Sequence, residues 1–199
     1  MGDPRAEQPA GADSVVIAAQ GRASLVARDV ELGDVPPVPV ERIAESLLGL
    51  LIEEHDDVRS LPNGPTDLGR LSGMIDPPSR TIWLDRYECG KSRGRRRFTI
   101  AHECGHWVLH LGRGKGAGVY CRPADVVDRP SVDAARLAGR EREANLFASE
   151  LLMPEILVTE QARETKGNMA ALAERFDVSV PAMRVRVQAL GLVAAWRRR

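Results

Sequence analysis

The sequence has few of the features that mark several large classes of protein. Aromatic residues make up 4% of the 199 residues, so stacking on bases or sugar rings is not expected to dominate recognition. The formal net charge is zero, which argues against attachment to nucleic acid or to a membrane surface through overall charge. No stretch approaches the roughly 20 apolar residues that span a bilayer. The composition therefore predicts a protein without membrane association.

Cysteine is scarce as well. The three cysteines are odd in number and form no Cys-x-x-Cys pair, so we interpret them as reduced thiols. The opening stretch MGDPRAEQPAGADS lacks the basic and then apolar order of a secretory signal. Because reduced thiols are typical of reducing compartments, both features favour a cytoplasmic location.

The first half of the chain predicts a lead-in, a helix and a small sheet. Residues 1–37 contain few apolar runs and end in two prolines, which predicts a flexible segment. Apolar residues at helical spacing predict a helix over 40–54. GRLSGMI (69–75) and RTIWLD (80–85) are short runs bounded by turn residues and predict paired strands. RTIWLD is either an edge strand, to which an extended peptide could add, or a core strand anchored by its apolar side chains.

The second half of the chain predicts mainly helices. The basic run KSRGRRR (91–97) is interpreted as a solvated loop, with acidic substrate or DNA phosphates as alternative partners. Residues 112–131 are rich in Gly and Pro and predict a loop. A long helix is predicted over 131–154, closed by Pro154. Residues 168–193 predict a helix, a short turn and a second helix.

This C-terminal pattern is typical of a helix–turn–helix unit. The turn is predicted at Asp177–Ser179, with Ser179 as the N-cap of the second helix. Arg184 and Arg186 could then face DNA from that helix. The alternative is that these helices pack on the rest of the protein or help to dock a substrate.

Three of the four histidines lie within FTIAHECGHWVLH (98–110). His102, Glu103 and His106 match H-E-x-x-H, and on a helix residues i and i+4 share a face, so both imidazoles can reach one metal ion. Glu103 points about 100° away, near enough to hold a water bound to that ion. The alternative is a partly buried helix with incidental histidines. The ordered combination of two ligands and a base disfavours it.

His110 continues the i+4 series but is not expected to be a ligand. Eight residues of helix place it about 12 Å from His102 along the axis. Both would have to lie about 2 Å from one ion. We interpret His110 as structural or as a residue that orients a ligand. Cys104, about 200° round the helix from His102, is expected to be a small core residue.

A catalytic zinc site needs a third protein ligand. His55 is expected at the surface, and Cys121 lies in a predicted loop. On the helix predicted over 131–154, Glu141 falls about 45° from the centre of the apolar face and Glu143 more than about 100° away. These positions on a helical wheel favour Glu141 as the third ligand, with Glu143 as the alternative. Asn145, one turn later, could orient Glu141.

Other polar residues receive smaller roles. Glu150 lies on the predicted solvent side of the same helix and is interpreted as an ordinary surface charge. A donor that would stabilise an oxyanion is not singled out. Tyr87, Tyr120 and the arginines before the histidine helix are the candidates.

The combined pattern resembles a known family. RRRFTIAHECGHWVLH followed by EREANLFASELLMP is similar to the ImmA/IrrE family of bacterial and phage metallopeptidases, over about residues 38–193. With the order of elements, the resemblance implies an α+β fold. It implies a zincin-like metallopeptidase domain over 38–155, with a small sheet and the active-site helix. A helical helix-turn-helix-like segment over 156–199 would follow it, and the flexible lead-in over 1–37 would precede it.

The resemblance also implies a site and a substrate. His102, His106 and Glu141 would be the metal ligands, and Glu103 the catalytic residue. Zinc is the expected metal, although two histidines and a carboxylate also suit manganese or iron. Family members typically cleave a helix-turn-helix transcriptional repressor encoded nearby, which derepresses mobile-element or stress-response genes. The expected function is therefore a zinc-dependent endopeptidase of narrow specificity. The competing class is a non-proteolytic regulator with a structural metal site that binds a partner protein or, less favoured, DNA.

Overall fold

The computed structural model describes the backbone of Ala23 and of residues 36–62, 64, 70–111, 119–121 and 132–192, and the side chains of these residues outside 119–121 and 132–136. Most of the predicted lead-in and most of the predicted loop over 112–131 therefore lie outside the described residues. Within the described part of the chain, no helix combines the length and hydropathy needed to cross a bilayer.

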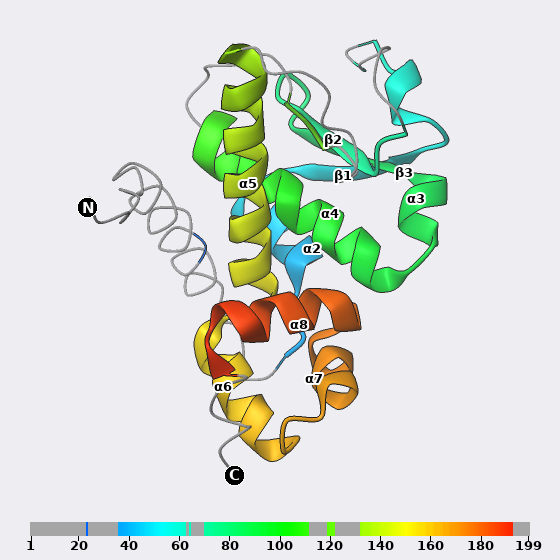
Figure 1. Ribbon diagram of the computed structural model, residues 1–199. Helices are drawn as coiled ribbons and strands as arrows, with labels where there is room; N and C mark the ends of the chain where they lie inside the picture. Colours follow the sequence, from blue (N-terminus) through cyan, green and yellow to red (C-terminus); the bar gives the residue numbers. More distant parts are fainter. Residues whose placement is uncertain are drawn as a thin grey trace, which may run out of the picture.

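A four-stranded sheet forms the upper layer of the molecule (Figure 1). Its strands are β1 (Leu51–His55), β2 (Gly73–Asp76), β3 (Thr81–Asp85) and β4 (Val119–Cys121), in the order β1-β3-β2-β4. β2 and β3 pair antiparallel, as their short apolar runs predict, and β1 runs parallel to β3. RTIWLD is therefore an interior strand, and the edge-strand alternative is wrong. β4, at an edge, falls in the stretch predicted to be loop, where three residues are too few to show a strand pattern.

The predicted helix over 40–54 is wrong in its second half. A single helical turn, α2 (Val40–Arg42), continues as the π-helical turn η1 (Ile43–Leu47) and stops before Gly49. Gly49 has a φ of 62°, in the left-handed region that ends helices, and the chain then enters β1. The guanidinium of Arg80 donates hydrogen bonds to the carbonyl of Gly49, at 3.1 Å, and to that of Leu48, at 2.8 Å. Apolar spacing did not reveal this break because Ile43 and Leu50, on either side of it, are both buried and fit one helical face.

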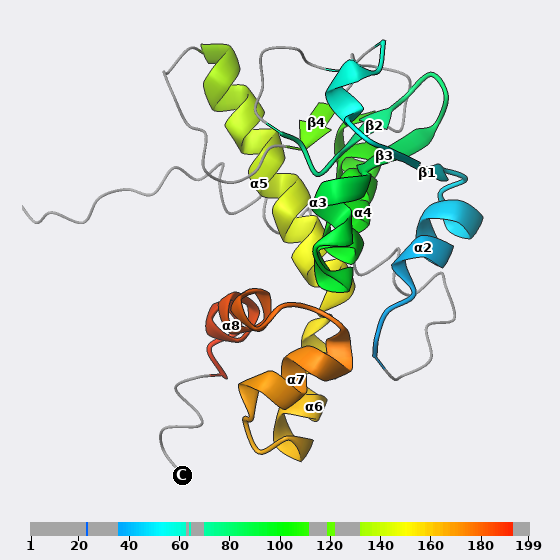
Figure 2. The ribbon, with the colours of Figure 1, turned by 90° about the vertical axis from the view of Figure 1, so that its right-hand side faces the viewer.

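Two helices pack against each other beneath the sheet (Figures 1 and 2). After α3 (Arg86–Gly90), α4 (Arg93–His106) carries the histidine motif and continues as the π-helical turn η3 (Trp107–Leu111). The long helix α5 (Val132–Leu152) ends just before Pro154, which confirms the helix predicted over 131–154. Their contact is close at Gly105, because a Cβ there would lie 3.1 Å from the Cα of Ala144.

The basic run KSRGRRR is not a solvated loop, because most of it forms the first turns of α4. Ser92 caps the helix by accepting a hydrogen bond from the backbone N–H of Arg95. Cations at a helix N-terminus oppose the helix dipole, and acidic side chains from other elements offset them. The ion pairs are Arg93 and Arg97 with Asp177, Arg95 with Glu88, and Arg96 with Glu54. Arg97 is also buried and donates to the carbonyl of Val38 at 2.7 Å.

The C-terminal helices lie beneath α4 and α5 (Figure 1). They are α6 (Glu155–Glu164), α7 (Met169–Phe176) and α8 (Val180–Ala189). Asp177 takes the left-handed conformation after α7, and the Ser179 hydroxyl accepts a hydrogen bond from the N–H of Ala182, which confirms the predicted turn and cap. Phe176, Met183 and Val187 are fully buried and join these helices to the core of the protein.

Two charged residues predicted at the surface lie inside the junction between α5 and α8. Glu150 is 9% exposed and Arg186 is 4% exposed, and their side chains form an ion pair. Arg186 also donates through Nε to the carbonyl of Met153 at 2.9 Å. The predicted solvent-side position of Glu150 and the predicted DNA-facing position of Arg186 are therefore wrong. The sequence of one helix does not show which other helix packs on it. Arg184, by contrast, is exposed.

Candidate metal centre

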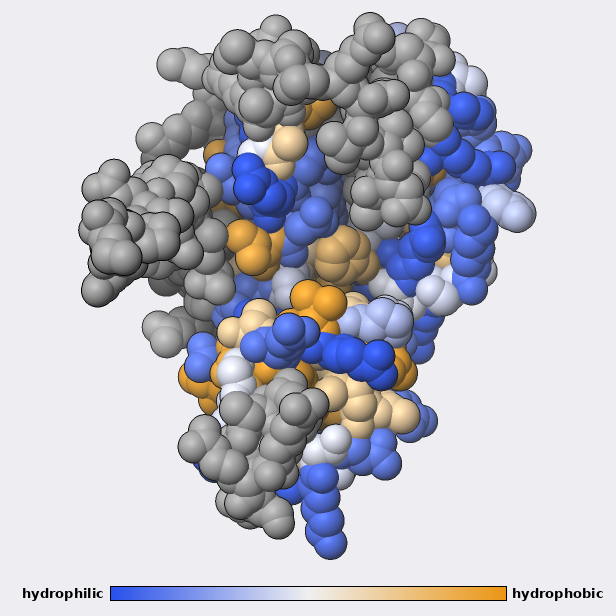
Figure 3. Space-filling view, viewed as in Figure 1, coloured by the Kyte–Doolittle hydropathy of each residue, from blue (hydrophilic) through white to orange (hydrophobic). Residues whose placement is uncertain are grey.

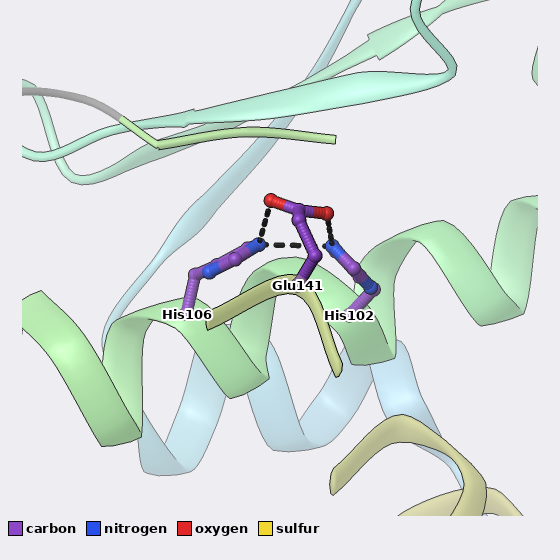
Figure 4. Close-up of side chains that lie close together, drawn as sticks. All are labelled: His102, His106 and Glu141. Atoms are coloured by element: carbon purple, nitrogen blue, oxygen red, sulfur yellow. Dashed lines mark hydrogen bonds and ion pairs between the residues drawn. The ribbon is translucent and has the colours of Figure 1, made fainter. Parts of the chain in front are cut away.

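His102 and His106 lie one turn apart on α4 and point to the same place (Figure 4). Their Nε2 atoms are 2.9 Å apart, and both side chains are almost completely buried. The helical spacing of the motif is sufficient to produce this geometry, because residues i and i+4 share a face. The surrounding core residues Ile100 and Ala101 hold α4 in place.

Glu141 reaches the same point from α5 (Figure 4). One carboxylate oxygen lies 3.3 Å from His102 Nε2, and the other lies 3.3 Å from His106 Nε2. Of the residues that the structure describes, these three form the cluster of His, Cys, Asp and Glu side chains able to share a metal ion, with ligand atoms within 4.8 Å of one another. Glu143 is turned elsewhere, with its carboxylate 3.6 Å from His110 Nε2. The alternative third ligand thus lies outside the cluster.

The spacing of these ligand atoms fits a tetrahedral zinc ion. Bonds of about 2.0–2.1 Å at tetrahedral angles place ligand atoms about 3.3 Å apart. Each carboxylate oxygen of Glu141 lies 3.3 Å from the Nε2 atom of one histidine, and the two Nε2 atoms lie slightly closer to each other. Three protein ligands of this kind leave a fourth position for water, as catalytic zinc sites do.

The charge state of the cluster also suits a cation. Burial lowers the pKa of His106 from 6.5 to about 4, so its imidazole is neutral near pH 7. Burial alone would raise the pKa of Glu141, but hydrogen bonds with His102 and His106 outweigh this effect and lower it to about 2. Glu141 is therefore ionised, and a carboxylate beside a neutral imidazole favours a cation at this point.

Glu103 follows His102 on α4 and is completely buried. The adjacent Cys104 is buried as well, and burial raises the pKa of its thiol, which keeps it protonated. Cys104 belongs to the hydrophobic core, as predicted. The next residue, Gly105, provides the room in which Ala144 of α5 approaches α4.

The remaining candidates occupy other positions. His110 Nε2 lies 3.4 Å from the carbonyl of Arg140 and near Glu143, away from the ligand cluster. His55 ends β1, half-buried, with Nδ1 2.9 Å from the carbonyl oxygen of Asp57. Tyr87 is 60% exposed, with cations on its ring. The side chains of Tyr120 and Cys121 lie outside the described residues.

Asn145 contacts a different partner from the one that the sequence suggests. Its Oδ1 lies 2.9 Å from Nδ1 of His102, so it approaches a histidine, whereas the helical spacing had pointed to Glu141. Spacing within α5 shows that Asn145 and Glu141 share a face. It does not show which atom of α4 lies opposite each of them.

Comparisons with known proteins support this fold. A solved structure of a Mycobacterium tuberculosis transcriptional regulator is similar, with a TM-score of 0.52 and 18% identity, over 85% of this chain and 45% of that one. The chain thus spans less than half the length of that regulator. No curated protein matches the sequence. The family model of a peptidase domain, described as the IrrE N-terminal-like domain, matches residues 57–188, which include both helices of the metal centre. The chain belongs to this IrrE-like peptidase family, as its two motifs suggested.

Proposed function

We propose that the protein is a zinc-dependent endopeptidase of narrow specificity that cleaves a helix-turn-helix transcriptional repressor. The observation that carries the proposal is the convergence of His102, His106 and Glu141 on one point, with Glu103 next to the first ligand in the chain. In a member of a peptidase family, this arrangement is best explained as a hydrolytic centre.

Glu103 has the role of general base and then general acid in this proposal. His102, His106 and Glu141 would hold the zinc ion, which when bound would supply Lewis acidity and lower the pKa of water toward about 7. The Glu103 carboxylate takes a proton from the attacking water as its oxygen bonds to the scissile carbonyl carbon. When the carbon–nitrogen bond breaks, Glu103 hands that proton to the leaving amine. Burial of Glu103 keeps the transferred proton away from bulk solvent.

The substrate chain has a plausible binding edge at β4. This strand pairs with β2 on one side and ends the described sheet. Figure 4 shows a strand edge passing over the three ligand side chains. An extended peptide could add to such an edge through main-chain hydrogen bonds. We therefore propose that the substrate adds to β4, and not to RTIWLD, which is an interior strand.

The resemblance of the two motifs to the ImmA/IrrE family is what points to a transcriptional target, because it implies a repressor as the substrate. The regulator from Mycobacterium tuberculosis shares the fold. A small helix-turn-helix repressor encoded beside the gene is the substrate that fits this role. Cleavage of it would derepress mobile-element or stress-response genes.

The contacts of α8 argue against the alternative function of DNA binding. A recognition helix reads bases with its N-terminal residues. Here that end faces α4: a Cβ on Gly94 would lie 3.3 Å from the backbone nitrogen of Ser179. Asp177, in the same turn, pairs with Arg93 at 2.6 Å. We infer that α7 and α8 support the peptidase fold.

The proposal is tested with purified protein and the repressor encoded next to its gene. Zinc-loaded protein is expected to convert the repressor into two fragments on a gel, with one new N-terminus in the mass spectrum. A chelator is expected to stop the reaction, and added zinc to restore it. If the protein relieves repression in cells while the repressor remains intact, the proteolytic proposal fails and the non-proteolytic regulator is favoured.

A further inference from the structure

Asn145 makes a contact that the proposed mechanism does not use. It lies one turn after Glu141 on α5, so both side chains face α4. Glu141 lies 3.3 Å from Nε2 of His102, and Asn145 Oδ1 lies 2.9 Å from Nδ1 of the same ring. One helix thus approaches both nitrogens of a single histidine.

The two groups bear on where the hydrogen of His102 lies. A carboxamide oxygen can only accept a hydrogen bond, and a neutral imidazole has only one N–H. When Nε2 binds a metal ion through its lone pair, that N–H lies on Nδ1, where Asn145 Oδ1 can accept it. In the metal-free protein the Glu141 carboxylate faces Nε2 and competes for the same hydrogen.

His106 provides a contrast within the same centre. Its Nδ1 is buried and has no hydrogen-bond partner among the residues that the structure describes. The Nδ1 side of His106 is therefore not held by a polar group in that part of the chain, whereas Asn145 holds the Nδ1 side of His102. The two ligands differ in how far their geometry is set before an ion arrives.

We propose that Asn145 is a positioning residue that fixes the ring orientation of His102 and accepts a hydrogen bond from Nδ1–H of its metal-binding tautomer. The inference rests on the metal site of the proposed function, but not on proteolysis. Residues that orient a metal ligand in this way typically contribute 10- to 100-fold to metal affinity. Asn145→Ala is therefore expected to weaken zinc binding by about 10- to 100-fold.

The experiment compares three variants by competition with a chromophoric zinc chelator. Asn145→Ala removes the acceptor, Asn145→Asp keeps one, and Arg142→Ala changes an exposed neighbour on the same helix as a control. Asn145→Asp is expected to bind zinc at least as tightly as the unsubstituted protein, because a carboxylate also accepts from Nδ1–H and raises the basicity of the ring. Arg142→Ala is expected to leave the affinity unchanged, because Arg142 is exposed. Should Asn145→Ala fail to fold, Asn145→Leu, which is close in volume, makes the same comparison.

A second measurement reads the Nδ1–H of His102 in the zinc-loaded protein. In NMR spectra of ¹⁵N-labelled protein, this hydrogen is expected to exchange slowly with solvent, and to exchange faster in Asn145→Ala, which lacks the acceptor. Zinc affinity unchanged in Asn145→Ala, or an unchanged exchange rate, overturns the inference. Failure of the unsubstituted protein to bind zinc at all would instead overturn the proposed function, so the two failures are distinguishable.

Discussion

The metal centre between α4 and α5 and the junction between α5 and α8 both bury charged side chains, but they do so differently. In the centre, a carboxylate meets two imidazoles, one of which is held neutral by burial. At the junction, Arg186 and Glu150 neutralise each other, and Nε of Arg186 also donates to the Met153 carbonyl. The first arrangement favours binding of a cation, whereas in the second the two charges already neutralise each other. Buried charge indicates a binding site only where the local charges do not already cancel.

The same difference explains which contacts could be predicted from the sequence. The convergence of His102 and His106 follows from a rule that acts within one helix, and the inward position of Glu141 follows from the apolar face of another. Arg97 and Arg186 are buried because acids distant in the chain lie opposite them, namely Asp177 and Glu150. Spacing within one helix carries no information on those partners.

The largest expected effect comes from breaking the chemistry of the centre while leaving its ligands in place. Glu103→Gln removes the proton acceptor, and the rate of repressor cleavage should fall by about 10²- to 10⁴-fold. Zinc content, measured by atomic absorption, should not change. Glu160→Gln makes the same chemical change at an exposed position on α6 and serves as control. Equal rates for both variants would remove Glu103 from the mechanism.

The next effect separates the two glutamates of α5. Glu141→Ala removes a ligand atom and should weaken zinc binding by at least about 100-fold, more than loss of a residue that only orients a ligand. Glu143→Ala should bind zinc nearly as well as the unsubstituted protein, because Glu143 faces His110. Chelator competition measures both affinities. The reverse order would show that Glu143 is the ligand.

A third substitution breaks the junction. Arg186→Met leaves Glu150 buried without its partner and should lower the free energy of unfolding by about 3 kcal/mol. Arg184→Met, at an exposed position on the same helix, should change it by less than about 0.5 kcal/mol. Urea denaturation measures both. If the two variants were equally stable, α8 would not be anchored through Arg186, and DNA binding by this helix would return as an alternative.

The smallest expected effect is the pH dependence that His106 gives to the stability of the metal-free protein. The pKa of His106 is about 4 in the folded protein, below its ordinary value of 6.5, so the unfolded chain binds more protons between pH 6.5 and 4. The free energy of unfolding should therefore decrease as the pH falls through this window, by about 2 kcal/mol between pH 7 and 5. Urea denaturation at several pH values measures this loss.

His106→Gln is the control for this pH dependence and should reduce it. Glu141 contributes little above pH 5, because its pKa is lowered from 4.5 to about 2 and its stabilisation is lost only below pH 4.5. A free energy of unfolding that stays constant or rises on acidification from pH 7 to 5 would contradict a neutral buried His106.

The sheet shows a further limit of sequence reasoning. The pairing of β2 with β3 follows from two short apolar runs with a turn between them. The position of β3 between β1 and β2 does not, because β1 comes from a stretch whose apolar spacing also fits a helix. The decisive residue there is Gly49, whose left-handed backbone ends the helical turn.

Gly105 determines how closely α4 and α5 approach each other beside the candidate metal centre. A Cβ at this position would lie within 3.2 Å of both the carbonyl oxygen of Ala144 and Cβ of Phe147, so the separation of the two helices depends on its absence. Glu141 is on the same helix as Ala144, less than one turn away, and metal–ligand distances tolerate only about 0.2 Å. A residue with no side chain therefore acts as the spacer that sets how closely the two helices carrying the candidate ligands approach each other.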